Sequence, residues 1–447
     1  MVRLAGNAAE PLTLALMLAT FGLLLLRGRW PLGIALVTAA WAGAAVNGDV
    51  LPLRHLVEGA SSYLDAILVI ATAMMFMRAL ADAGALAAIA WTVRRRFGHT
   101  PSILLPLVML IVMFPGMMTG SSTASVLTTG AMASSVLGGL GLAPARAAAF
   151  VAMGGVLGMV APPINIPAMI IGGGIDLPYV GFAAPLALGA FPLAAVLAYA
   201  LGAPLFRRAR VTASAPAVGS EPAGAAARRS EVESVAGDEP PEPLWRAAVP
   251  IAALAVMMLA PATWPRRVPD PGLPAIFVTS VLVVWATRPK LRLADSLTRA
   301  TKEALPVLGI LAGVGAFIQV MTLTGARGWL VSRMLAAPPW AVVPAAALGM
   351  PLFGAVSAFG SASVLGVPFL LASIGRNEIV TAAALSMLAG VGDLMLPASL
   401  AATLAARAAG LQDRRPVLRL CLLPGIALVL VAVAMLVTAP LLGGWLS

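Results

Sequence analysis

The sequence predicts an all-α polytopic membrane protein, and three observations support this fold class. Of its 447 residues, 60% are hydrophobic and 11% are charged, too few polar side chains to cover a water-soluble globule. The apolar stretches are continuous rather than alternating, which excludes a transmembrane β-barrel. The 29 Lys and Arg residues are spread between these stretches. Cytoplasmic basic loops that orient the chain explain them better than nucleic-acid binding does.

Apolar stretches follow one order in residues 1–206 and again in residues 245–447. In each part we expect five crossings, one re-entrant hairpin, and a fourth crossing interrupted by proline. Because five is odd, the second part would lie upside down, as in the inverted repeats of secondary transporters. Residues 207–244, rich in Ala, Ser, Pro and Glu, are predicted to form a flexible cytoplasmic linker. The expected hairpins cover about 101–140 and 339–375, and the expected broken helices about 147–174 and 378–407.

A polar tip interrupts each predicted hairpin, Gly120-Ser121-Ser122-Thr123 in the first and Gly360-Ser361-Ala362-Ser363 in the second. A hairpin that turns at half-depth presents the N-terminus of its second limb to the membrane centre. The unpaired N–H groups and partial positive charge of that end attract an anion. The alternative for any one serine is a hydroxyl that bonds back to its own helix. The residues expected to bind solute are Ser121, Ser122, Thr123, Asn165, Ser361, Ser363, Ser399 and Thr403.

Each expected broken helix contains a proline-bearing break, Ala161-Pro162-Pro163-Ile164-Asn165 in the first and Leu396-Pro397-Ala398-Ser399 in the second. Irregular backbone at membrane depth is tolerated where it lines a cavity, since its carbonyl groups can then bind an ion. Oxygen ligands of this kind suit a hard monovalent cation such as sodium. The residues expected around sodium are Gly120, Ser121, Thr123, Pro162, Asn165, Gly360, Ser361, Asp393 and Pro397.

Asp393 lies in a segment otherwise uncharged from Ile379 to Leu404. An ionisable group at that depth is costly unless it has a function or a partner, so we predict an ion or proton site. A structural carboxylate bonded to freed backbone donors is the alternative. Gly390-Val391-Gly392-Asp393 also matches the Gly-x-Gly-Asp signature of intramembrane aspartyl proteases. That enzyme would need a second intramembrane aspartate, and the candidate, Asp65, lies near a helix end.

The first tip with Thr128-Thr129-Gly130, followed by Pro162-Pro163, resembles the large membrane subunit of tripartite ATP-independent periplasmic (TRAP) transporters. More broadly it is similar to the ion-transporter superfamily that includes the divalent anion–sodium symporters. The resemblance implies a scaffold, a mobile elevator domain, sodium coupling, carboxylate or dicarboxylate cargo, and a bacterial inner membrane. It also implies ion sites at Ser121, Ser122, Thr123 and Asn165, and at Ser361, Ser363 and Pro397 to Ser399.

The sequence therefore predicts a sodium-coupled secondary transporter of a small organic anion, with no enzymatic activity and no bound cofactor. A TRAP-like subunit would work with a small membrane subunit and a periplasmic binding protein, whereas a stand-alone symporter would not. A passive channel is a further alternative. Both a monomer and a homodimer are compatible with the sequence.

Overall fold

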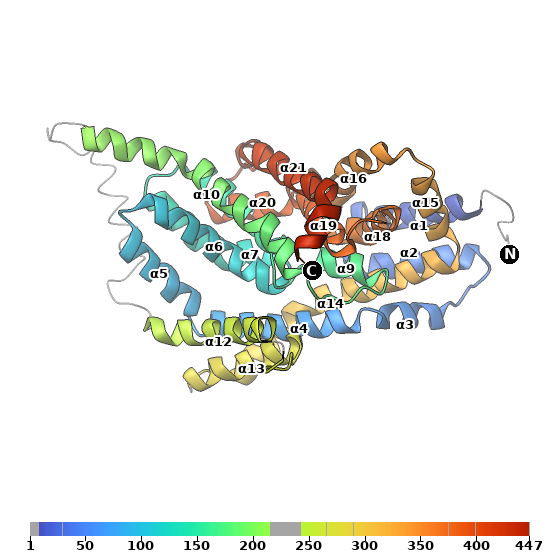
Figure 1. Cartoon of the computed structure of the whole chain (residues 1–447), viewed down its shortest axis with the longest axis horizontal. Coiled ribbons are helices and arrows are strands. Elements are labelled where there is room, and N and C mark those ends of the chain that lie inside the picture. Colours follow the sequence, from blue (N-terminus) through green and yellow to red (C-terminus); the bar gives the residue numbers. More distant parts are fainter. Residues whose placement is uncertain are drawn as a thin grey trace.

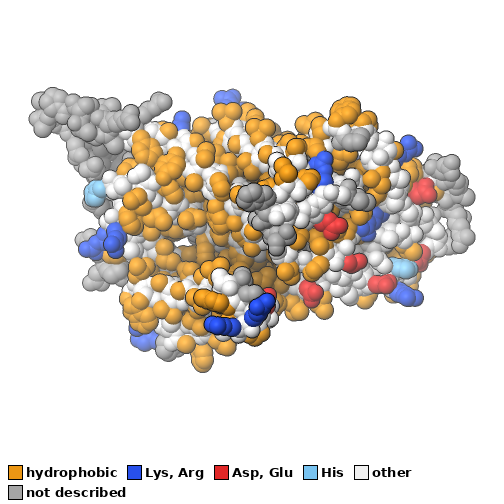
Figure 2. Space-filling model, in the orientation of Figure 1, with side chains coloured by type: hydrophobic (Ala, Val, Ile, Leu, Met, Phe, Trp, Pro, Cys, Tyr) orange, Lys and Arg blue, Asp and Glu red, His pale blue; other side chains and the backbone are white. Residues whose placement is uncertain are grey.

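The computed structural model describes residues 9–28, 30–214, 243–264, 266–288, 290–373, 375–397 and 399–446, and these residues are mainly helical. Six described helices are long and apolar enough to cross a membrane. Hydrophobic side chains cover most of the face drawn in Figure 2. The chain is therefore a multi-pass helical membrane protein. The six helices span 64–82, 101–119, 183–206, 244–261, 293–323 and 415–444.

One group of helices, here the support layer, is organised around α14 (Leu293–Leu323). This helix packs against α2, α3 and α4, while α13 packs on α4 and α12 on α13 (Figure 1). The other helices of this layer are α1 (Ala9–Leu26), α2 (Leu32–Val46), α3 (Leu53–Ser61), α4 (Leu64–Asp82), α12 (Leu244–Thr263) and α13 (Leu273–Thr287).

Glycines bring the backbones of the support layer together, as is common where helices associate inside a membrane. A Cβ on Gly313 of α14 would meet the backbone of Gly33 in α2. A Cβ on Gly315 would likewise meet the carbonyl group of Gly59 in α3. By contrast, a Cβ on Gly309 of the same helix would have nothing within 4 Å.

We expect Gly315→Ala to destabilise the protein by about 1–3 kcal/mol, because the added methyl group meets backbone that cannot turn aside. Gly309→Ala is the matched control, since it makes the same change on the same helix in open space. Thermal unfolding in detergent measures both. Equal melting temperatures for the two variants would show that this close approach is not limiting.

The second group of helices, here the hairpin layer, surrounds two helices that are buried on all sides. In α8, every residue from Ala147 to Val160 is buried, and in α19 every residue from Val380 to Val391 is buried. A helix that is apolar all round belongs in the interior. The first-half helices here are α6 (Pro101–Thr119), α7 (Ser122–Gly139), α8 (Pro144–Val160), α9 (Ile166–Gly173) and α10 (Ala183–Ser214). The second-half elements are α16 (Pro339–Gly354), α17 (Ala358–Ser361), η1 (Ala362–Gly366), α18 (Val367–Ala372), α19 (Glu378–Val391), η2 (Gly392–Leu394), α20 (Leu400–Ala408) and α21 (Arg415–Leu446).

The two halves of the sequence interlock in this layer. Helix α8 packs against α20 and α21 of the second half, and α9 packs against α19. In Figure 1, α6 and α7 lie to the left of centre while α16 and α18 lie to the right. Two short helices, α5 (Ala85–Phe97) and α15 (Ala326–Leu335), join the layers: α5 contacts α12 and α6, and α15 contacts α14 and α18.

One predicted boundary is wrong. Helix α10 runs to Ser214, past the expected end at 206, so the predicted linker starts too early. The remainder of that linker, 215–242, lies outside the described residues.

Candidate functional site

The first hairpin turns at Gly120 and Ser121. Gly120 ends α6 with φ +62°, a left-handed conformation that suits glycine. Ser121 caps α7 by accepting a hydrogen bond from the backbone N–H of Ala124 at 3.3 Å. One turn into α7, the Ser125 hydroxyl donates to the Val112 carbonyl of α6 and so ties the two limbs together.

The second hairpin turns at Ala355 to Ser357, not at the predicted Gly360-Ser361. Ser357 caps α17 and accepts a hydrogen bond from the Gly360 N–H at 3.0 Å. The Ser361 hydroxyl, one turn later, donates to the Met350 carbonyl of α16 at 2.7 Å. Ser357 and Ser361 therefore do in this hairpin what Ser121 and Ser125 do in the first. The predicted tip was displaced by one turn because Ser357 starts the helix before the Gly-Ser pair.

Ser363 lies in the π-helical segment η1 and is 2% exposed. Among the described residues, its hydroxyl has no hydrogen-bond partner. Buried polar groups are normally bonded, and π-helical segments are frequent at functional sites. Ser363 is thus the buried hydroxyl of this hairpin that stays available to a bound solute or ion.

Asn165 holds the first break together. Its side-chain oxygen caps α9 by accepting from the Ala168 N–H at 2.9 Å. Its amide nitrogen donates to the Val160 carbonyl at 3.0 Å and to the Ser386 hydroxyl of α19 at 2.8 Å. Its backbone N–H donates to the Tyr179 hydroxyl at 3.1 Å. In this conformation the amide therefore joins the two halves rather than facing a cavity.

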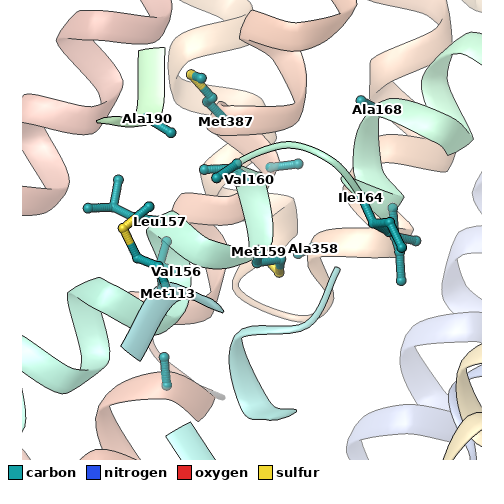
Figure 3. Packing of buried hydrophobic residues seen from close by; sticks show 14 of the residues in the cluster. Met113, Val156, Leu157, Met159, Val160, Ile164, Ala168, Ala190, Ala358 and Met387 are labelled. Atoms are coloured by element: carbon teal, nitrogen blue, oxygen red, sulfur yellow. The ribbon is translucent and has the colours of Figure 1, made fainter. Parts of the chain in front are cut away.

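Apolar side chains enclose the first break. Figure 3 shows Val160 just before the break and Ile164 within it, with Ala358 of α17 and Met387 of α19 in the same region. All four side chains are buried. The polar groups of the break are thus held in a region of low dielectric, where hydrogen bonds count for more than in water.

Asp393 lies just before the second break, in the short helix η2, and is half-buried. Its carboxylate accepts a hydrogen bond from the hydroxyl of Ser122, the first residue of α7. Leu396 is 63% exposed and Pro397 is also exposed, so this break opens onto the protein surface. A carboxylate from the second half therefore meets the first hairpin tip beside an exposed stretch of irregular backbone.

Ser399, the last residue of the second break, forms a polar group with Thr403 and Arg414. Ser399 is buried, and its hydroxyl lies 3.5 Å from that of Thr403. Arg414 donates to the Thr403 hydroxyl at 3.1 Å. Arg414 lies outside the segment that forms the second break, so no local pattern around that break points to it. The structure thus supplies a cation that can help hold an anion.

The predicted site residues fall into those that contact one another and those that are bonded to other parts of the fold. Ser122 and Asp393 meet, as do Ser399 and Thr403, whereas Asn165 and Ser361 are bonded to neighbouring structure. Thr123 and Pro162 are half-buried beside the first tip and first break. Asp65 is exposed in the first turn of α4. An intramembrane aspartyl protease would need Asp65 to be buried beside Asp393, whereas Asp65 is exposed in α4.

Sequence reasoning missed Ser357, Ser386, Tyr179 and Arg414. Ser357 could have been found, since a serine three residues before Gly360 is a capping signal. Ser386 and Tyr179 contact Asn165 through the tertiary fold, and the sequence holds no local sign of this.

The fold defined by these helices and breaks belongs to multi-pass membrane proteins, and comparisons with known proteins agree. The family model of the Na+/H+ antiporter family matches residues 11–197. The chain is similar in structure to Neisseria gonorrhoeae MtrF, described within a class of antimetabolite efflux pumps, with TM-score 0.60 and 13% identity over 98% of this chain and 96% of that chain. It is also similar to the Alcanivorax borkumensis YdaH transporter, with TM-score 0.57 and 16% identity over 98% of this chain and 99% of that chain. No curated protein matches. At these identities the two structures establish the shared fold.

Proposed function

We propose that this protein is a secondary active transporter that carries a small organic anion together with sodium. The observation that carries the proposal is the hydrogen bond between Ser122 and Asp393. It places an ionisable carboxylate between the first hairpin tip and the second break, beside irregular backbone whose carbonyl groups can complete a cation site. A carboxylate within a membrane protein needs such a function to offset its cost.

The anion site is proposed near the same place. The N-terminal end of α7 presents backbone N–H groups at Ser122 and Thr123. Arg414, with Ser399 and Thr403, supplies positive charge and hydroxyl groups at and beyond the end of the second break. Sodium bound at Asp393 would add charge that favours an anion, which couples the two binding events. The resemblance to TRAP and divalent anion–sodium transporters supports a carboxylate as cargo.

We further infer an inverted repeat and an elevator motion. Each half presents the same succession: a hairpin with a serine-capped second limb, a buried helix, a break, and a long final helix. Among the described residues, two hydrogen bonds reach the end of α9 from outside the hairpin layer. Tyr63 donates to the Ile170 carbonyl at 2.9 Å and Arg327 to the Gly174 carbonyl at 2.5 Å, both at the end of α9. The hairpin layer would slide by exchanging these bonds.

Reconstitution of the purified chain in liposomes tests the proposal. We expect at least one radiolabelled mono-, di- or tricarboxylate to accumulate against its gradient when a sodium gradient is imposed, and not with an equal potassium gradient. Accumulation by the chain alone would also show that no partner subunit is required. Equilibration without accumulation would instead indicate a channel and overturn the proposal.

Sodium–proton exchange without organic cargo is a second candidate, favoured by the family match over residues 11–197. The Asp393 carboxyl could bind either cation in turn. Liposomes loaded with a pH-sensitive dye distinguish the two candidates. Sodium is added outside the liposomes with no carboxylate present. If the chain exchanges sodium for protons, the lumen becomes alkaline because protons leave as sodium enters. A pulse without effect would favour coupled anion transport.

A further inference from the structure

The carboxyl end of α9 lies where the support layer meets the second hairpin. Helix α9 packs against η1 and α18 of that hairpin. A Cβ on Gly174 would meet the side chain of Val367 in α18, and a Cβ on Gly173 would meet the ring of Tyr63. Tyr63 directly precedes α4 of the support layer and is 3% exposed. The end of α9 is therefore enclosed between the two layers, with no room for a side chain.

Two side chains donate hydrogen bonds to carbonyl groups at this end of α9. The Tyr63 hydroxyl donates to the Ile170 carbonyl at 2.9 Å, and Arg327 of α15 donates to the Gly174 carbonyl at 2.5 Å. The residue four positions after Gly174 is Pro178, which has no N–H to offer that carbonyl. Carbonyl groups at a helix end also carry partial negative charge, which favours a cation such as Arg327. Both side chains therefore satisfy backbone groups at the end of α9.

Helix α9 connects this contact to the first break. It has eight residues, so its two ends are about 12 Å apart. At its other end, Asn165 caps the helix and bonds to Ser386 of α19. Every residue from Ile166 to Gly172 is buried, which leaves the helix little space in which to bend. A movement of the carboxyl end of α9 would therefore carry the first break with it.

A second contact between the layers is apolar. Phe21 of α1 stacks on Phe353 of α16, with ring centroids 6.4 Å apart. A Cβ on Gly360 of α17 would lie 3.3 Å from the ring of Phe21. Apolar contacts are non-directional and allow neighbouring surfaces to slide, whereas a hydrogen bond requires one distance and one angle. The bonds to α9 therefore fix one position of the hairpin layer on the support layer.

We propose that Tyr63 and Arg327 form a latch that holds α9 and the second hairpin against the support layer in this conformation, and that the latch opens when the hairpin layer moves. This inference rests on the elevator motion proposed above and adds the contact that controls it. Opening frees the carbonyl group of Gly174, which water can reach because Gly174 is half-buried. Neither Tyr63 nor Arg327 is among the residues proposed to hold solute or sodium. The latch therefore controls movement rather than binding.

Labelling of buried thiols in the full-length protein with a water-soluble maleimide tests the latch. Gly360→Cys places a thiol against Phe21, so labelling at position 360 requires the layers to separate. Cys421 lies within the hairpin layer, is 2% exposed and reports unfolding in the same sample. In this background, Tyr63→Phe should speed labelling at position 360 by about three- to fivefold, the effect of one hydrogen bond. Arg327→Met removes a charged donor and should speed it by about tenfold, while labelling of Cys421 stays unchanged.

Tyr199→Phe is the matched control for the tyrosine variant. The Tyr199 hydroxyl donates to the Ser102 carbonyl at 2.8 Å, but this bond joins α10 to α6 inside the hairpin layer. Arg333→Met is the control for the arginine variant, because Arg333 lies on the same helix, is exposed and sits over the ring of Trp329. Neither control should change labelling at position 360.

Several results would overturn the latch: unchanged labelling at position 360 in both latch variants, an equal rise in the control variants, or an equal rise at Cys421. The measurement needs neither sodium nor solute, so it is separate from the liposome test. Carboxylate accumulation by the wild type, with no labelling change in the latch variants, would overturn the latch alone. Faster labelling in the latch variants, with no accumulation by the wild type, would support the latch and overturn the proposed transport.

Discussion

Replacing Asp393 by asparagine is expected to abolish stabilisation of the protein by sodium and transport driven by a sodium gradient. The two side chains have nearly the same shape, so Ser122 can still bond to the residue, but the negative charge is lost. A pair of unit charges about 4 Å apart near a protein surface interacts by about 4 kcal/mol, roughly a thousandfold in affinity. Thermal unfolding with increasing sodium, at constant ionic strength, measures the change.

Two further variants separate charge from position. Ser122→Ala keeps the carboxylate but removes the bond that orients it, so we expect sodium affinity to fall by about tenfold. Asp65→Asn removes an exposed carboxylate from α4 and should respond to sodium as the wild type does. If Asp65→Asn and Asp393→Asn lose the response equally, Asp393 has no special role.

Asn165→Ala is expected to destabilise the protein by about 3 kcal/mol and to lower transport with it. The change removes the cap of α9, the bond to the Val160 carbonyl and the bond to Ser386. Each buried group left without a partner costs about 1–3 kcal/mol, although bonds inside membranes contribute less on average. The midpoint of unfolding in a denaturing detergent measures the loss.

Asn377→Ala supplies the control for this second prediction. Asn377 is half-buried and caps α19 by accepting from the Val380 N–H at 3.0 Å, but it does not join the two halves. Loss of a cap alone costs about 1 kcal/mol. We therefore expect Asn165→Ala to be clearly the more damaging change. The same midpoint for both variants would mean that Asn165 acts only as a cap.

The backbone features of the first half of the candidate site could be predicted from sequence because their signals are local. Gly120-Ser121 combines a helix-ending glycine with a capping serine, and Pro162-Pro163-Ile164-Asn165 combines a break with a capping asparagine. Both patterns depend on backbone chemistry within a few residues. The predicted bounds of the hairpin, 101–140, are therefore close to those of α6–α7. The predicted bounds of the broken helix, 147–174, are likewise close to those of α8–α9.

The second half was harder because its signals compete. Ser357, Ser361 and Ser363 lie within one stretch of seven residues. Of these three serines, only Ser357 caps a helix with its side chain. The contacts that join the halves could not be predicted, since Ser122 and Asp393 are 271 positions apart and Asn165 and Ser386 are 221 apart. Such pairings follow from tertiary packing of α7, α8 and α19.

Equilibrium binding of radioactive 22Na+ to the purified protein tests most directly whether sodium binds at Asp393. We expect saturable binding to the wild type and to Asp65→Asn, and none to Asp393→Asn at the same concentrations. Saturable binding to Asp393→Asn with wild-type affinity would contradict the assignment of this carboxylate as the sodium ligand.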